Sequence, residues 1–537
     1  MRQTIDWRIA VCAVAALAAL IHMTPYWHAQ SQTPAGWTFT GNVNTSPDFM
    51  QYRVWERQTL QTGILVANKF TTEPNQPHLP VIFYFLIGQI ARGTQLAPEI
   101  IFAYAGALFA FLLTVLLFFT IQKFIPSLHQ AWWVLLVILF GGGLGAHLKI
   151  ISNIPVLRDN ILLRRTLIEG LWSWMVFEDY RSHYVFVTLF DTHFLLIWLL
   201  ATAAVLALYI TIKNFSWGWL GLTCFMFALS TLIHLYEGIT LAVIASAVAF
   251  TLWRKTLLTR VHLITFGMAI LAVALCLIAQ LYLFNRSGLA LPAWRAVNVL
   301  FATLLIAYPI AWGVIAWGGL KYWQHAGLAE TFLVGWALGC TALTLSGPFY
   351  PYPDRGTMTL QIPIYIIAGQ IFFARWPRMT PLIVGILILI LGATPVTTFA
   401  LQWKFTNFDP TRAAVFTSRA HREIVAVLTE RAGENDVIIL DKTDFDWGTD
   451  DLWIAPEYPG KFYAGHFFLT PDYDKKRAEV NRFFEGSPND QAAFLREKRI
   501  RFVYVNANQN PHRFEQIPGL RLLKSEPIGA LFEYATE

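Results

Sequence analysis

The chain has 537 residues, of which 55% are hydrophobic and only 14% are charged, and its formal net charge is +6. A soluble globular protein carries roughly 25% charged residues, so this composition excludes an ordinary soluble domain and indicates a polytopic membrane protein. The positive charges are spread through linkers and form no dense run, which argues against nucleic acid as a partner. The four cysteines all lie in apolar segments and lack the spacing of a zinc site or a disulfide framework.

The N-terminal segment resembles a signal peptide but is better interpreted as a retained anchor. Arg2 and Arg8 precede the apolar run 9–21, which is short for a membrane span. No clear site with small residues for cleavage follows that run directly. We therefore expect a retained helix whose N-terminus is cytoplasmic.

Further apolar stretches follow, each near the roughly 20 residues that a helix needs to cross the hydrocarbon core. The segment 79–93 contains a shorter apolar run, and we expect it to form a re-entrant or interfacial helix. The longer stretches are 98–121, 131–148, 184–211, 217–234, 236–253, 261–284, 296–318, 328–346, 360–375 and 381–400.

Basic residues in the short linkers predict the orientation of the spans. They occupy every second connection, and by the positive-inside rule these connections are cytoplasmic. With about eleven spans and a non-crossing segment 79–93, the N-terminus is also inside; the alternative of about twelve spans places it outside, against its own charge. The linker residues are Lys123, Lys213, Arg254, Lys255, Arg260, Lys321, Arg375 and Arg378.

In this orientation, every polar segment that could take part in catalysis or binding lies on the outer face. We expect a transmembrane module over residues 1–401, with a first outer loop at 24–78, and an extracytoplasmic α/β domain over residues 402–537. In that domain, helical patterns at 419–431 and 490–498 precede short β-rich runs at 437–440 and 501–505, and this alternation favours a partly parallel sheet. The pair 520–524 and 529–534 is predicted to form a hairpin.

The first outer loop carries a candidate catalytic carboxylate. From Phe49 to Gly63 apolar residues recur at helical spacing, with Arg53 and Arg57 on another face, which suggests a helix lying along the membrane surface. Asp48 stands at the start of this helix. Asp48 could be a helix cap. Alternatively, it could remove a proton from the hydroxyl or amine group that receives a transferred group, or it could bind a divalent metal ion, the one cofactor that the sequence suggests. On the surface-helix interpretation, Glu56 is an exposed carboxylate without a role.

The N-terminal span, the outer loop with an acid near its start, the amphipathic helix and the entry Pro77-His78-Leu79-Pro80 together resemble the GT-C superfamily. These membrane glycosyltransferases include protein mannosyltransferases and aminoarabinose transferases. The chain departs from the family pattern in two places: Asp48 is followed by Phe49 where an adjacent Asp-Glu pair is common, and the proline entry lacks a second consecutive proline.

The resemblance implies transfer of a hexose or pentose, with inversion, from a polyprenyl-phosphate-linked donor to a glycan, lipid or protein acceptor at the outer face. It carries over Asp48 as the base. Tyr52 and His78 are assigned to substrate binding beside it.

Two further polar groups are predicted to lie on the same face. Asp179 and His183 are spaced i,i+4 and would share one helix face, as an acid–base or metal-binding pair or as an ordinary polar helix entry. Tyr352, Asp354 and Arg355 belong to a proline-spaced aromatic loop, in which Arg355 would bind a lipid phosphate or extend to lipid headgroups. We expect these groups to lie within about 10 Å of Asp48 around one cavity.

The chief alternative is a non-enzymatic transporter or scaffold whose outer domain binds a partner. Transporters place ionisable groups along a path through the membrane. Here such residues are scarce within the apolar segments, where Asp191, His193 and Glu330 are the main exceptions. The sequence therefore favours surface chemistry over translocation.

The charge pattern makes a testable prediction about topology. Cysteines introduced at Asp48, Asp354 and Asp472 should react with an impermeant thiol reagent from outside the cell, whereas a cysteine at Lys321 should react only after the membrane is opened. Labelling of positions 472 and 321 from the same side would contradict the orientation.

Overall fold

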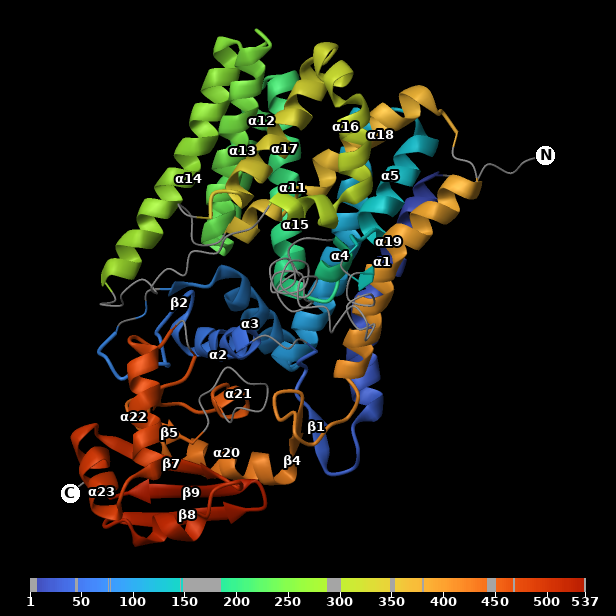
Figure 1. The fold of residues 1–537 in the computed structure, drawn as a ribbon. Coiled ribbons are helices and arrows are strands. Elements are labelled where there is room, and N and C mark those ends of the chain that lie inside the picture. The colour runs from blue at the N-terminus through green and yellow to red at the C-terminus, as the bar shows by residue number, and fades with distance from the viewer. Residues whose placement is uncertain are drawn as a thin grey trace, which may run out of the picture. The chain divides into compact units, whose positions relative to one another are not determined.

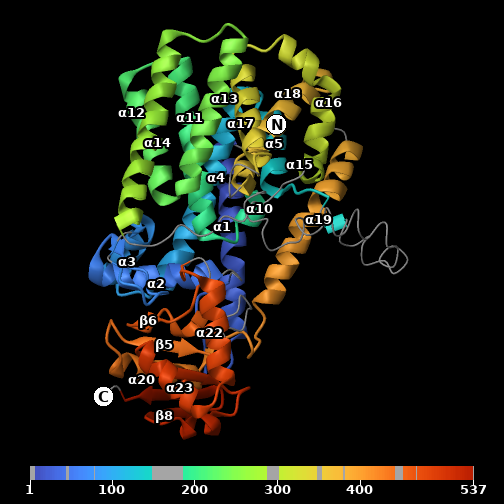
Figure 2. The same cartoon turned by 60° about the vertical axis from the view of Figure 1, so that its left-hand side comes forward.

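The computed structural model describes residues 7–43, 47–75, 77, 79–144, 146–147, 185–286, 301–347, 353–378, 381–441, 451–466 and 469–535. The chain divides into two compact units, which are considered separately. Unit 1 comprises Met1–Pro25, Ala103–Ala279 and Trp294–Phe405, and unit 2 comprises Tyr26–Phe102, Gln280–Ala293 and Thr406–Glu537. Figures 1 and 2 show the elements of both.

Unit 1 is a bundle of apolar helices, and three of them continue into unit 2. α1 (Trp7–Gln32) and α14 (Arg260–Arg286) end in unit 2, and α4 (Pro98–Phe124) begins there. The other helices of the bundle are α5 (Leu128–Phe140), α10 (Val185–Thr188), α11 (Thr192–Lys213), α12 (Trp217–Ile233), α13 (Leu235–Arg254), α15 (Phe301–Ala307), α16 (Pro309–Gln324), α17 (Leu328–Thr344), α18 (Gln361–Arg375) and α19 (Pro381–Phe405).

The lengths of these helices agree with a membrane protein. Among the described residues, six helices are long and apolar enough to cross a membrane, and three more apolar helices are shorter. The stretch predicted to be too short for a span forms α3 (Ile82–Thr94) in unit 2. Its 13 residues would extend only about 20 Å at 1.5 Å per residue, less than the hydrocarbon thickness.

Two of the predicted spans are each interrupted by a helix break. The stretch 184–211 forms α10 and α11, and the carboxylate of Asp191 between them accepts hydrogen bonds from the backbone N–H groups of His193 and Phe194. The stretch 296–318 contains α15 and α16, separated at Tyr308 and Pro309. Asp191 is therefore the N-cap at a break between two helices and does not lie inside a continuous helix.

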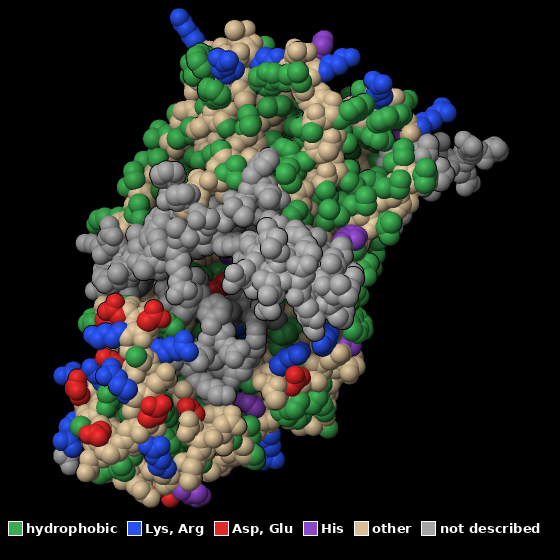
Figure 3. All heavy atoms as spheres, viewed as in Figure 1, with side chains coloured by type: hydrophobic (Ala, Val, Ile, Leu, Met, Phe, Trp, Pro, Cys, Tyr) green, Lys and Arg blue, Asp and Glu red, His purple; other side chains and the backbone are tan. Residues whose placement is uncertain are grey.

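Basic side chains gather at one end of the bundle. The last turns of α4, α11, α13, α16 and α18 each contain Lys or Arg. These helix ends meet, because Lys255 Nζ donates to the carbonyl of Gln324 at 3.3 Å and Gln370 Nε2 donates to the carbonyl of Phe124 at 2.8 Å. Figure 3 shows Lys and Arg at this end and mainly hydrophobic side chains along the flank of unit 1.

The C-terminal part of unit 2 is an α/β domain with a mixed sheet in the order β6-β5-β7-β9-β8. β5 (Val437–Leu440) pairs in parallel with β6 (Lys461–Phe462) and β7 (Ile500–Asn506). β8 (Leu520–Glu526) and β9 (Gly529–Tyr534) form the predicted antiparallel hairpin. The expected partly parallel sheet is confirmed.

Both faces of this sheet are buried. Val437 and Ile439 belong to one apolar core, whereas Ile438 and Leu440 belong to the other, because successive strand residues point to opposite faces. The first core receives residues of α22 (Tyr473–Glu485) and α23 (Pro488–Glu497), and the second receives residues of α20 (Arg419–Arg431) and α21 (Asp451–Ile454).

The first outer loop is part of the same unit. β1 (Trp37–Phe39) pairs antiparallel with β4 (Phe416–Ser418). α2 (Pro47–Thr62) contributes Met50 and Val54 to the core on one face of the C-terminal sheet. A further two-stranded sheet joins β2 (Leu65–Val66) to β3 (Leu79–Pro80). Residues separated by almost 400 positions thus form one folded body.

The predicted helix that begins near Asp48 exists, but its charged residues are not exposed as the surface-helix interpretation expects. Its Met50 and Val54 are buried in the C-terminal core, while the ring of Tyr52 stacks on Tyr84 of α3 at 4.9 Å between centroids. Arg53 and Glu56 are also buried. Much of the apolar pattern therefore packs inside unit 2, and Figure 1 shows α2 beside α3.

Candidate functional site

Asp48 lies in the first turn of α2 and pairs with a histidine of the C-terminal domain. His466 Nε2 is 3.2 Å from Asp48 Oδ1. The histidine side chain is 1% exposed and the carboxylate side chain is 44% exposed. Because an ionised carboxylate only accepts hydrogen bonds, the histidine nitrogen donates in this pair. The first turn of a helix also favours a negative charge.

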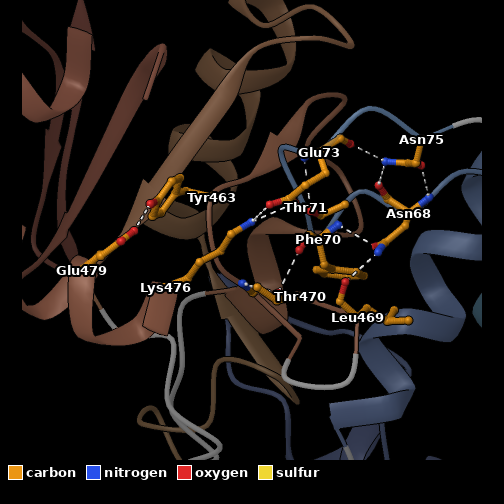
Figure 4. Close-up of polar contacts among 11 residues, drawn as sticks. Asn68, Phe70, Thr71, Glu73, Asn75, Tyr463, Leu469, Thr470, Lys476 and Glu479 are labelled. Atoms are coloured by element: carbon orange, nitrogen blue, oxygen red, sulfur yellow. Dashed lines mark hydrogen bonds and ion pairs between the residues drawn. The ribbon is translucent and has the colours of Figure 1, made fainter. Parts of the chain in front are cut away.

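The residues around His466 are fastened to the first outer loop, as Figure 4 shows. Asn68 Nδ2 donates to the carbonyl of Leu469 at 2.6 Å, and Thr470 Oγ1 donates to the carbonyl of Phe70 at 2.8 Å. Lys476 Nζ lies 2.7 Å from Glu73 Oε1. These contacts connect the loop to residues that follow His466 in the sequence.

A buried charge cluster holds α2 against the start of α4. Arg53 forms ion pairs with Glu56, at 3.3 Å, and with Glu99. The side chains of Arg53 and Glu56 are 9% and 1% exposed. Burial raises the pKa of Glu56 to about 7, while the charges of Arg53 and Arg57 oppose this rise. Glu56 is therefore not the exposed, role-free carboxylate that the surface-helix interpretation predicted.

Aromatic rings cover another side of α2. Tyr52, Trp55 and Tyr84 lie with centroids 4.9–6.0 Å apart. Stacked and tilted rings of this kind form a rigid apolar surface. Tyr52, which is predicted to bind substrate, thus lies one helical turn from Asp48, within this cluster of aromatic rings.

Unit 1 has a polar cluster at the ends of its helices remote from the basic residues. The rings of His193 and His234 lie 5.6 Å apart, and His234 Nδ1 is 3.5 Å from Glu237 Oε1. The Arg355 guanidinium lies over the ring of Phe194 at 5.0 Å. These residues come from the first turns of α11 and α13, from His234 at the N-cap of α13, and from η3 (Pro353–Thr357). Over the 22 residues of α11, the rise of 1.5 Å per residue separates this cluster from Lys213 by about 30 Å.

Several predicted site residues lie outside the described residues, namely Asp179, His183, His78 and Tyr352. Asp354 belongs to η3, but its side chain is not among those described. Asp48 is in unit 2 and Arg355 is in unit 1. The expectation that all of these groups surround one cavity therefore stays a prediction.

In the part of the chain that the structure describes, no group of three His, Cys, Asp or Glu side chains is arranged to hold a metal ion. Asp48 and His466 supply one oxygen and one nitrogen donor, whereas Mg²⁺ prefers oxygen ligands in octahedral geometry. The pair alone fits a hydrogen bond better than a divalent metal site.

Sequence reasoning missed His466 and the clustering of His193, His234 and Glu237. His466 lies more than 400 positions from Asp48, in a segment whose only local signal is Tyr463-Ala464-Gly465-His466 after a short strand. His234 and Glu237 are only three positions apart, and in the sequence they have the pattern of an ordinary polar turn between two helices. No spacing within the sequence indicates the long-range contacts that join these residues.

No protein-family model matches the chain, and no curated protein matches its sequence. Its fold is nevertheless similar to solved structures. One is the arabinofuranosyltransferase AftD from Mycobacteria, with 15% identity and a TM-score of 0.56 over 99% of this chain and 40% of that chain. A second structure, of a mutant of AftD, has 15% identity and a TM-score of 0.58, over 99% of this chain and 42% of that one.

A third structure is ArnT from Cupriavidus metallidurans bound to undecaprenyl phosphate, with 11% identity, a TM-score of 0.53 and coverage of 98% of both chains. The chain thus spans less than half of AftD and almost all of ArnT. The chain has the fold of these solved structures, which confirms the fold predicted from the resemblance.

The buried Glu56 predicts a pH dependence of stability. Its pKa is raised from 4.5 to about 7, so the folded state binds the proton more tightly than the unfolded chain. The contribution of this protonated side chain to the free energy of unfolding is complete below about pH 4.5. It is lost as the pH rises through about 7. Glu56→Gln should remove this dependence: relative to the parent, the variant should gain up to about 3 kcal/mol between pH 5 and pH 8, at about 1.4 kcal/mol per pKa unit.

Unfolding of the full chain in detergent at a series of pH values measures this difference. Glu430→Gln, which changes an exposed carboxylate of α20 in the same unit, serves as the control for the loss of a carboxylate. A difference between parent and Glu56→Gln that does not change with pH would contradict the buried, proton-binding state of Glu56.

Proposed function

We propose that the chain transfers a sugar from a polyprenyl-phosphate-linked donor to an acceptor at the outer face of the membrane, with inversion at the anomeric carbon. The observation that carries the proposal is the position of Asp48 in a chain with the GT-C fold. Asp48 is a half-exposed carboxylate at a helix N-terminus, held by a buried histidine. The undecaprenyl phosphate bound in the ArnT structure supports a polyprenyl lipid as the donor carrier.

In the proposed reaction, Asp48 takes the proton of the acceptor hydroxyl. The acceptor oxygen forms a bond with the anomeric carbon from the face opposite the leaving group, and the bond between that carbon and the phosphate oxygen breaks. The polyprenyl phosphate leaves with the bonding electron pair. This single displacement inverts the anomeric carbon and needs no oxidant or reductant.

The exposure of Asp48 suits this role. A base must reach the proton that it removes, within about 2.6–3.2 Å, and a 44% exposed side chain is open to an acceptor. A divalent metal ion bound by Asp48 would instead polarise the acceptor or neutralise the phosphate. In that case His466 would either be a second ligand of the metal ion or form a hydrogen bond to the first ligand, Asp48.

Arg355 is the proposed partner of the donor phosphate. A planar guanidinium can bind a phosphate through two parallel hydrogen bonds. The neighbouring His193 and His234 would add positive charge when protonated. The cluster lies at the end of unit 1 opposite the basic linkers, and by the positive-inside rule this end faces outward. We accordingly place the protein in the cell membrane, with its N-terminus cytoplasmic and its C-terminal domain outside.

Substitution of Asp48 tests the role of the base. Asp48→Asn should preserve expression and folding while lowering kcat by about two to four orders of magnitude, the usual contribution of general acid–base catalysis. Transfer of labelled pentose from undecaprenyl-phosphate-linked arabinofuranose or aminoarabinose, by the full chain in liposomes with membrane glycan and lipid extracts as acceptors, measures the effect. Asp474→Asn is a matched control, since Asp474 is an exposed acid in the first turn of α22. Full transfer by Asp48→Asn would refute the assignment.

Substitution of Arg355 tests the donor contact. A phosphate contact exists in the ground state as well as in the transition state, so Arg355→Ala should mainly raise the KM for the donor, by about tenfold or more for a charge-assisted contact. Arg375→Ala is the matched control, because Arg375 also lies over an aromatic ring, Trp317, at the basic end of the bundle. An unchanged donor KM in Arg355→Ala would remove Arg355 from the donor site.

A further inference from the structure

We propose that His466 is a positioning residue for Asp48, so that the C-terminal domain completes the catalytic centre as well as binding an acceptor. This inference rests on the proposed role of Asp48 as a base. It assigns to the C-terminal domain a residue that acts on the carboxylate itself. Three features of unit 2 carry it: the contact, the burial of the histidine and the way the histidine backbone is fastened.

The contact has a defined direction. Because Nε2 of His466 donates to Asp48 Oδ1 across 3.2 Å, Nε2 carries the proton, in the neutral or the charged form of the ring. The bond restrains rotation of the carboxylate about its last side-chain torsion. One oxygen is then engaged with the histidine, and we assign the acceptor proton to the other oxygen, Oδ2.

The histidine ring has little freedom of its own. Its side chain is 1% exposed, and its ring packs on that of Phe70 with centroids 5.8 Å apart. A fixed donor orients a base more effectively than a mobile one, because the entropy of alignment is lost on folding and not during the reaction.

The backbone around His466 is held by Thr470. The carbonyl of His466 accepts hydrogen bonds from the N–H groups of Leu469 and Thr470, at 3.0 and 2.9 Å. Thr470 Oγ1 accepts from the N–H of Gly465 at 3.1 Å and donates to the carbonyl of Phe70 at 2.8 Å. A Cβ at position 465 would lie 2.8 Å from Phe70 Cδ1, so the approach requires glycine.

The first outer loop fixes this arrangement from the other side. The N–H of Phe462 donates to the carbonyl of Lys69 at 2.8 Å, and Glu73 pairs with Lys476. Figure 4 shows Asn68, Phe70 and Glu73 of the loop lying against Leu469, Thr470 and Lys476. The loop that leads away from α2 is thus bound on both sides of the histidine that contacts Asp48.

A purely structural role for the pair is the competing explanation. In that case the contact would add stability, and catalysis would respond only through loss of folded protein. The two explanations predict different values of kcat for a folded chain in which His466 is changed. They also differ on whether substitutions at His466 and Asp48 lower kcat independently of each other.

Two substitutions at His466 separate the hydrogen bond from the packing. His466→Phe keeps a ring against Phe70 and removes the donor, and His466→Gln keeps an N–H donor. In the liposome assay with undecaprenyl-phosphate-linked arabinofuranose or aminoarabinose, His466→Phe should lower kcat about 10- to 100-fold, the range typical of residues that orient a functional group. The donor KM should change by less than about twofold, since the donor contact is untouched. His466→Gln should recover most of the loss.

The double variant gives the sharpest result. If His466 acts through Asp48, adding His466→Phe to Asp48→Asn should not lower kcat further, because the two residues form one unit. Equal kcat for His466→Phe and the parent, or multiplication of the two single effects, would overturn the proposal. A loss of transfer in Asp48→Asn together with full activity in His466→Phe would refute the positioning role alone.

A readout without turnover keeps this inference separate from the proposed function. An experimental structure of the full chain carrying His466→Phe should show the Asp48 carboxylate turned away from its orientation in the parent. An unchanged orientation would overturn the proposal, whatever the activity. Absence of transfer by the parent itself would count against the proposed function and would leave this structural result in force.

Discussion

The docking of the first outer loop on the C-terminal domain is the interaction on which the rest of unit 2 depends. It joins β1 to β4, places Phe70 in the core of the C-terminal sheet and inserts Met50 and Val54 of α2 beside it. Closing a chain over almost 400 residues costs more entropy than closing a short loop, though this cost grows only slowly with length. Burial of large apolar side chains offsets it, at roughly 1.5–3 kcal/mol for each fully buried one.

That docking explains why the catalytic assignment and the domain architecture belong together. Asp48 lies at the end of a helix whose flank is buried in the C-terminal core, and His466 is fastened to the loop that follows the same helix. The contact between the carboxylate and His466 therefore forms only when both parts of the chain are folded together. On the inference drawn above, a separate C-terminal domain would be an incomplete part of the site.

Charge is distributed differently in the two units. In unit 1, Lys and Arg gather at one end of the helices, and the polar cluster of His193, His234, Glu237 and Arg355 lies at the other. In unit 2, Arg53 is buried with two carboxylates where α2 meets the first turn of α4. Buried charges cost several kcal/mol each unless they are paired, so this cluster favours one specific position of α2. Glu99 opens α4, which continues into unit 1, and the same cluster thus involves a helix shared by both units.

The sequence by itself determined the class of the protein and most of the local structure. Apolar length predicts membrane helices, and the alternation of patterns in the C-terminal domain predicts its sheet, because burial and backbone geometry impose periods that are visible in short windows. The helix of Asp48 was also predictable from spacing, but its surroundings were not: Arg53 and Glu56 look like surface charges in the sequence and are buried in the structure. His466 and Asp48 carry no shared signal, because their contact depends on docking between segments more than 400 residues apart. Tertiary structure alone decided that pairing, since hydrogen bonds and burial act on distance in space, whereas periodicity records only neighbours along the chain.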